Sequence, residues 1–145
     1  MNIRQTRAAA GALLLGLCAM GAHAADRTVY LPFAPEVEAA LAAGRIDGSV
    51  KFALAGTGSP GQVIRADVVT NKKTNAFAKS DANACSWAMQ SALIQLHEAA
   101  KEAGASRVVN IVSFYKRNEF RSTTDFECHA GAVVAGVALK ADLSK

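Results

Sequence analysis

The chain has 145 residues, 51% of them hydrophobic, and this length suits one domain that can bury a core without the help of metals. Its formal net charge is +4 and its pI is about 9.2. Two of the arginines, Arg4 and Arg7, belong to a predicted leader, so the remaining domain is close to neutral and nucleic-acid binding is not indicated.

Residues 1–24 have the pattern of a secretory signal peptide. Two arginines precede an apolar run over residues 8–20, and Ala22-His23-Ala24 follows as an A-x-A cleavage site. The run is shorter than the about 20 residues that span a bilayer. We therefore expect a single mature domain over residues 25–145, located in the periplasm and without a transmembrane segment. Cys18 leaves a lipid anchor as an alternative.

The elements of the mature domain can be predicted in chain order. Strands are expected over residues 27–33, 49–55, 62–70, 107–115 and 125–143. A short helix should begin at Pro35 and end at Gly44, and a long helix should cover residues 84–103. This order predicts an α+β fold, in which one long and one short helix cover one face of a mostly antiparallel sheet of four to five strands.

The long helix and the strand after it form the centre of this prediction. Apolar residues recur along the helix at spacings of three and four, so that one face is committed to a core. Ser80, Asp81 and Asn83 are candidate N-caps, and Gly104 can end the helix in the left-handed conformation. Asn110, set among β-branched residues of the next strand, is expected to complete a hydrogen-bond network in the core.

Two cysteines remain after cleavage, Cys85 and Cys128, in a compartment where disulfides form and persist. We expect them to bond to each other, which on the chain-entropy model stabilises the fold by about 4 kcal/mol. A zinc site that combines them with His97 or His129 is the alternative, but no C-x-x-C pair is present. Adjacent strand residues also point to opposite faces, so Cys128 and His129 would not readily share an ion. We predict no bound metal.

No motif indicates a cofactor or a catalytic centre. Residues 56–61 match G-x-G-x-x-G, yet a strand pattern follows where a dinucleotide site needs a helix, so we interpret them as a hairpin loop. No phosphate loop is present, and no activated nucleophile can be paired with a histidine. We expect a non-enzymatic protein without a cofactor; a small-molecule or metal-binding protein or a hydrolase, with a site near His97 and His129, is the alternative. His97 itself is expected to be half exposed on its helix.

Two predicted connections carry basic residues beside aromatic ones. If the connections met at one end of the sheet, they would form a basic rim that could contact an anionic lipid, lipopolysaccharide or an acidic partner protein. An ordinary solvated surface is the simpler interpretation. The basic residues are Lys72, Lys73 and Lys79 in the first connection, and Lys116, Arg117 and Arg121 in the second.

The block over residues 70–143 resembles a family of small secreted proteobacterial proteins without an established activity. The resemblance is specific over the C-terminal half of the chain and loose over the N-terminal half. Members often carry a label naming an excinuclease ATPase subunit, but such an ATPase needs phosphate loops, which this sequence does not contain.

The long helix and the following strand are also similar, more distantly, to the YbjQ-type domain, which is labelled as heavy-metal binding, and to the outer-membrane stress-sensor lipoprotein of the Rcs pathway. The second resemblance implies an envelope protein that is braced by disulfides and works through protein contacts. The matching residues are Ala92, Leu96, Gly104, Ala105, Val108 and Val109.

Our leading hypothesis is a periplasmic, non-enzymatic binding or protein-interaction module whose partner is an envelope protein or an anionic surface. Its expected contact surfaces are the two basic connections and an exposed edge of the sheet. A homo-oligomer that forms along the last strand is a further expectation.

Overall fold

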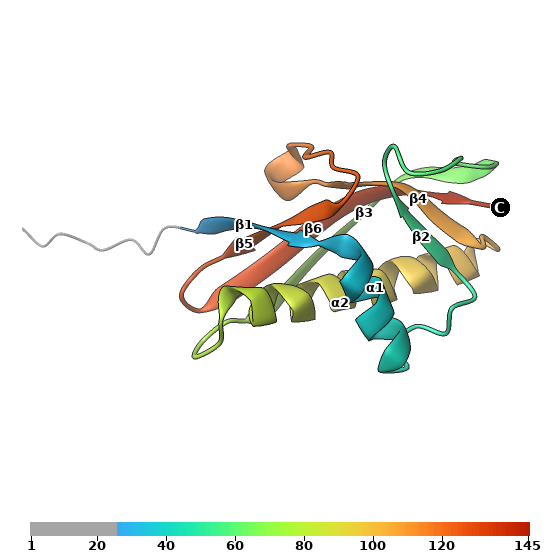
Figure 1. Ribbon diagram of the computed structural model, residues 1–145. Helices are drawn as coiled ribbons and strands as arrows, with labels where there is room; N and C mark the ends of the chain where they lie inside the picture. The colour runs from blue at the N-terminus through green and yellow to red at the C-terminus, as the bar shows by residue number, and fades with distance from the viewer. Residues whose placement is uncertain (1–25) are drawn as a thin grey trace, which may run out of the picture.

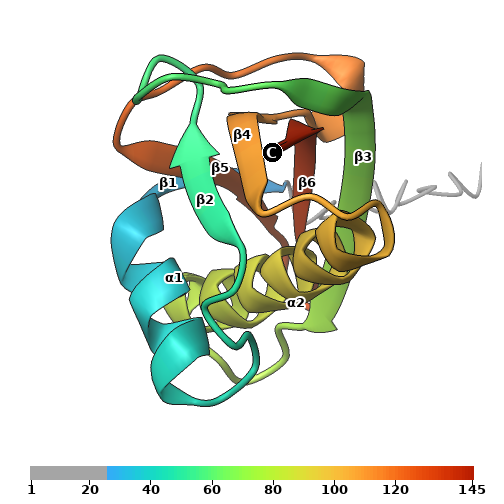
Figure 2. The same cartoon turned by 90° about the vertical axis from the view of Figure 1, so that its right-hand side faces the viewer.

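The computed structural model describes residues 26–145, so the predicted signal peptide and its cleavage site lie outside the described residues. These residues form one mixed sheet with two helices on one of its faces (Figures 1 and 2). The α+β prediction is confirmed. The elements are β1 (Arg27–Pro32), α1 (Phe33–Ala42), β2 (Lys51–Leu54), β3 (Val63–Asn75), α2 (Asp81–Glu102), β4 (Arg107–Ser113), the 3-10 turn η1 (Tyr115–Arg117), β5 (Asp125–Ala130) and β6 (Val134–Ser144).

Strand β6 is the centre of the sheet. β3 pairs with one of its edges over almost its whole length, while β5 and β4 pair with successive parts of the other edge. β1 lies outside β5, and β2 lies outside β4 as the parallel pair in an otherwise antiparallel sheet. Both edges of β6 are thus occupied within the chain, and the predicted homo-oligomer stays a prediction. β1, β2 and β3 each pair with a single neighbour within residues 26–145.

The sheet has six strands instead of the expected four to five, because the last predicted strand is a hairpin. The chain reverses between β5 and β6, where the backbone N–H of Gly131 donates to the carbonyl of Val134 at 2.9 Å. The turn contains apolar residues, and this is why the run over residues 125–143 resembled one continuous strand. Two further boundaries differ from the prediction: α1 begins at Phe33, and β3 continues through the polar residues up to Asn75.

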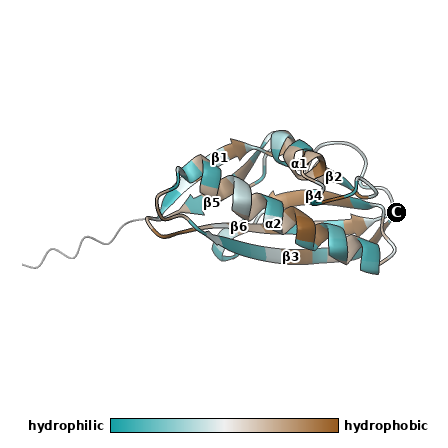
Figure 3. Cartoon of the chain, turned by 90° about the horizontal axis from the view of Figure 1, so that it is seen from below, coloured by the Kyte–Doolittle hydropathy of each residue, from teal (hydrophilic) through white to brown (hydrophobic). Residues whose placement is uncertain are grey.

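Helix α2 begins at Asp81, three residues before the predicted start, and ends at Glu102, one residue before the predicted end. The Ser80 hydroxyl accepts a hydrogen bond from the backbone N–H of Asn83 at 3.2 Å, and Gly104 follows the helix with φ +69°. α2 lies across β6 and β3, and hydrophilic residues recur along its outer side (Figure 3). The helix contributes a buried apolar face to the core, made of Ala84, Cys85, Ala88, Met89, Ala92, Leu93, Leu96 and Ala100.

The disulfide between Cys85 and Cys128 is confirmed, with an S–S distance of 2.05 Å. It joins the first turns of α2 to β5, and both cysteines are fully buried. The bond therefore fastens the helix layer to the sheet at the end where the β5–β6 hairpin turns. Within residues 26–145, no helix combines the length and the apolar character needed to cross a membrane.

Candidate functional site

The two faces of the sheet have different surroundings. Alternate residues of β6, from Ala135 to Leu143, are buried beneath α2, whereas Gly136, Lys140 and Asp142 point to the other face. Because both helices lie on the first face, we call the second one the open face. The connection over residues 114–124 runs above part of it, as the orange segment in Figure 1 shows.

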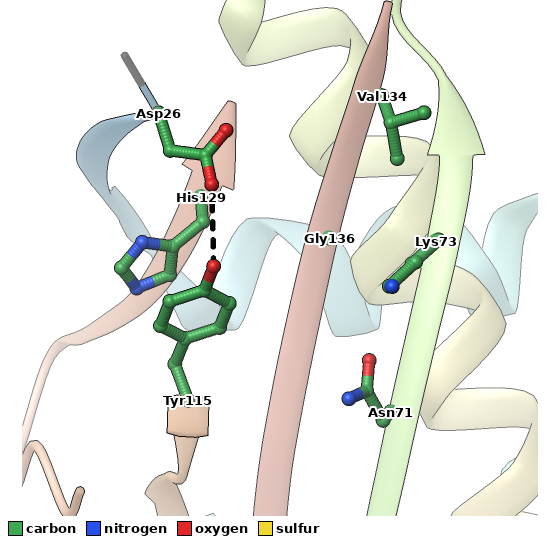
Figure 4. Close-up of a pocket in the computed structure, with 7 residues that line it drawn as sticks. All are labelled: Asp26, Asn71, Lys73, Tyr115, His129, Val134 and Gly136. Atoms are coloured by element: carbon green, nitrogen blue, oxygen red, sulfur yellow. Dashed lines mark hydrogen bonds between the residues drawn. The ribbon is translucent and has the colours of Figure 1, made fainter. Parts of the chain in front are cut away.

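A hollow of about 310 Å³ lies on the open face. Tyr115 and His129 form one side of it, and Asn71 and Lys73 of β3 form the other (Figure 4). Gly136 of β6 lies between these two sides, so that no side chain rises from the floor at this position. Asp26 and Val134 complete the lining.

The Tyr115 side of the hollow is held by several contacts. The rings of Tyr115 and His129 are stacked with their centroids 3.4 Å apart, and the His129 Nε2 atom lies 2.7 Å from the Glu127 Oε1 atom. The Tyr115 hydroxyl donates to the Asp26 carboxylate at 3.3 Å. Two consecutive residues after Tyr115, Lys116 and Arg117, have positive φ values of 50° and 67°, which bend the chain at this point. These contacts fix the orientation of the aromatic wall.

The Lys73 side of the hollow offers unused hydrogen-bond donors. Asn71 and Lys73 are alternate residues of β3, so their side chains lie on the same face of the strand. Within residues 26–145, neither side chain takes part in a hydrogen bond or an ion pair. An ammonium and an amide are therefore available to a ligand at this wall.

His97 and His129 lie on opposite sides of the sheet, so the structure does not bring them into one site. Cys128 points to α2, and its neighbour His129 therefore points to the open face. His97 is on α2, and only 6% of it is exposed, which corrects the prediction that it is half exposed. In the described part of the chain, no three residues among His, Cys, Asp and Glu are placed to hold a metal ion.

His97 has a structural partner in Asp47, which lies in the connection between α1 and β2. The His97 Nε2 atom is 2.8 Å from the Asp47 Oδ1 atom, and the Lys101 ammonium donates to the Oδ2 atom at 3.0 Å. The Ser49 hydroxyl and backbone N–H lower the pKa of Asp47 most strongly, and Lys101 and His97 lower it further. His97 thus anchors the loop before β2 to the helix.

The six predicted basic residues lie on several different elements of the structure. Lys72 and Lys73 are part of β3 and not of a connection, and Lys79 lies in the loop before α2. The Lys116 ammonium lies 5.2 Å from the centre of the Tyr115 ring, while Arg117 follows it in η1. Arg121 is 3.8 Å from Glu119, a carboxylate that also binds Lys140.

A different apolar and basic surface lies at one end of the molecule, where the β3–α2 loop meets the β5–β6 hairpin (Figure 1). Phe77 is 70% exposed, Val133 is 61% exposed and Val134 is 46% exposed. The two loops are joined by a hydrogen bond of 2.7 Å from the backbone N–H of Ala76 to the carbonyl of Val133. We call this surface the end patch, defined as Phe77, Val133 and Val134 with the neighbouring Lys73 and Lys79.

The loop that carries Phe77 is an organised structure. The Asn75 side chain accepts from the backbone N–H of Phe77 at 2.8 Å, and the Asn75 carbonyl accepts from the Lys79 ammonium at 2.9 Å. Ala78 has φ +57°, an unfavourable conformation for a residue with a Cβ atom. The sequence showed Phe77 as a lone aromatic residue in a polar stretch, but it could not show that Val133 lies beside it.

Comparisons of the chain with models of protein families, with curated proteins and with solved structures found no match. The resemblances described above therefore stay predictions. The function has to be inferred from the hollow and the end patch themselves.

Proposed function

We propose that the protein is a non-enzymatic interaction module of the periplasm that docks, through its end patch, on an anionic lipid surface of the cell envelope. The observation that carries this proposal is the end patch, where two hydrogen-bonded loops expose three large apolar side chains beside two lysines.

The chemistry of the end patch matches the interface of a bilayer. Transfer of an exposed Phe or Val side chain out of water is worth about 1.5–3 kcal/mol when burial is complete. Lysines near an anionic surface add about 1 kcal/mol each through attraction to the lipid phosphates. Lys73 lines the end patch, and the Lys79 ammonium lies beside it on the Asn75 carbonyl, so both can contact lipid phosphates while Phe77 and Val133 insert.

The size of the patch favours lipid over a protein partner. A stable protein interface covers about 800 Å² on each partner, with some 20–30 residues. The end patch consists of three apolar side chains on two loop tips, which is small for such an interface but sufficient for shallow insertion between lipid head groups.

The buried disulfide supports the proposed compartment. Bonds of this kind form and persist outside the cytoplasm, and the predicted signal peptide would deliver the chain there. A link to envelope stress depends on the distant resemblance to the sensor lipoprotein and is part of the same proposal.

Co-sedimentation with vesicles tests the proposal. Residues 25–145 should sediment with vesicles that contain phosphatidylglycerol and phosphatidylcholine, and much less with phosphatidylcholine alone, because the lysines need anionic lipid. Phe77→Ser and Val133→Ser should each weaken sedimentation several-fold. Val69→Ser is the matched control, since Val69 is 51% exposed on β3 outside the end patch, and it should bind like the wild type.

Three results would count against the proposal. The first is binding that Phe77→Ser leaves unchanged, and the second is an equal loss in Val69→Ser. The third is a wild-type dimer that Phe77→Ser converts to a monomer without any vesicle binding, since the end patch would then be a contact between copies of the chain.

A further inference from the structure

We infer that the hollow on the open face binds a small organic carboxylate, held by Lys73 and Asn71 against the stacked rings of Tyr115 and His129. The hollow shares Lys73 and Val134 with the end patch but takes a different ligand, and it assigns a ligand class to the small-molecule alternative considered from the sequence.

The floor of the hollow is open because residue 136 is glycine. The backbone at Gly136 lies outside the left-handed region, and a Cβ atom there would make only ordinary contacts, the nearest being 3.5 Å from the Lys72 carbonyl and the Lys73 Cγ atom. Neither the fold nor the packing therefore demands glycine. Its effect is to keep the space between Tyr115 and Lys73 empty, at a volume near the lower limit of ligand sites.

The charges of the two walls place the carboxylate on the β3 side. Lys73 and Asn71 present an ammonium and an amide donor at alternate positions of one strand, and no group among the described residues uses them. On the opposite side, Asp26 lines the hollow and accepts from Tyr115, while Glu127 is bonded to His129 without lining the hollow itself. The Lys116 ammonium lies 5.2 Å from the centre of the Tyr115 ring. The Asp26 carboxylate repels an anionic group from its part of the lining, whereas Lys73 attracts that group to β3, and the two charges together orient the ligand.

The remaining lining suits the organic part of such a ligand. The Tyr115 ring and the Val134 side chain offer apolar and aromatic surface, which an inorganic anion cannot use. The position of the Tyr115 ring is fixed by its stacking on His129, so little ordering is needed when a ligand binds. The donors on β3 and the apolar and aromatic lining together select a carboxylate that has an attached apolar group.

A titration followed by NMR amide shifts tests this assignment, with benzoate as the probe. Benzoate should produce saturable shifts at the amides of Lys73, Val134 and Gly136. Benzamide, which has the same shape without the charge, and inorganic phosphate, which has charge without the apolar body, should produce none. Lys73→Met should weaken benzoate binding roughly tenfold, and Asn71→Ala should weaken it less, because a neutral donor contributes less than a charged one.

Lys79→Met is the matched control, because Lys79 does not line the hollow, and it should bind benzoate like the wild type. Saturable shifts with benzamide, or with phosphate alone, would overturn the assignment of a carboxylate ligand. Unchanged binding in Lys73→Met, or benzoate shifts that lie away from the hollow, would overturn the site. Phe77→Ser should keep benzoate binding, so a failure of the lipid proposal can be told apart from a failure of this one.

Discussion

Asp142 supports two bulges in the strands on either side of β6. Asp67 in β3 and Asn110 in β4 have φ values of 55° and 53°, and each lies where the register of its strand against β6 shifts. The Asp142 Oδ1 atom accepts from the Asp67 backbone N–H at 3.0 Å, and the Oδ2 atom accepts from the Asn110 amide at 2.8 Å. One carboxylate thus holds both irregular segments in place.

Replacement of Asp142 should therefore weaken the fold. Asp142→Ala removes two hydrogen bonds and should lower the free energy of unfolding by about 1–2 kcal/mol, whereas Asp142→Asn keeps one acceptor and should lose less. Equilibrium urea unfolding measures both values. A loss within about 0.5 kcal/mol for Asp142→Ala, the usual range of a neutral surface substitution, would show that the bulges form without this support.

Asp47 should make stability depend on pH in the acidic range. Its pKa is lowered in the folded protein by Ser49, Lys101 and His97, so its contribution is complete above the unfolded pKa of about 3.9 and is lost as the pH falls toward the folded value. The carboxylate is partly exposed, so solvent and salt should reduce the effect. Urea unfolding at pH 7 and pH 3 should show a smaller loss on acidification in Asp47→Asn than in the wild type. Equal losses would mean that another carboxylate dominates.

At this scale the sequence predicted some residues well and others poorly. The structure confirms the Ser80 cap, the helix end at Gly104 and the bond between the two cysteines. His97 was assigned to a half-exposed position because its partner Asp47 is 50 residues away in the sequence. Asn110 was assigned to the core, but it is exposed in a bulge, which a β-branched pattern does not reveal.

At the scale of elements, the disulfide is the main connection between the helix layer and the sheet beside the hairpin. The double replacement Cys85→Ala with Cys128→Ala should lower the free energy of unfolding by about 4 kcal/mol, because the unfolded chain loses a cross-link between residues 43 apart. Native mass spectrometry should find no thiol that can be alkylated before reduction. Alkylation of both cysteines in the native, unreduced protein would contradict the bond.

The bounds of an element could be predicted where the signals lie in its own sequence. They were harder to predict where they depend on pairing with a strand that is distant in the sequence. α2 combines periodicity, a cap and a glycine end, so its bounds could be predicted from the sequence to within three residues. β3 continues through Lys72 and Lys73 because β6 pairs with them, although their polar stretch resembled a loop. The loop over residues 56–61 was expected to join a hairpin, but β2 pairs with β4 and β3 pairs with β6.

At the scale of the molecule, the sheet built around β6 has two faces with different surroundings. The helices cover one face, and the hollow lies on the other. The end patch lies where the β3–α2 loop and the β5–β6 hairpin meet, and the opposite end holds the junction of Gln62, Ser106 and the C-terminal residues. The long-range pairings create this arrangement, so composition and periodicity could predict the residues of each surface only in part.

The orientation of the protein on a membrane is the most direct test of the docking proposal. Paramagnetic broadening of backbone amides by a spin-labelled lipid, in vesicles that contain phosphatidylglycerol, reports which residues approach the bilayer. We expect the strongest broadening at residues 76–79 and 131–134, and little at residues 58–62 and 104–106 of the opposite end. Broadening that is uniform, centred on the opposite end, or absent would contradict docking through the end patch.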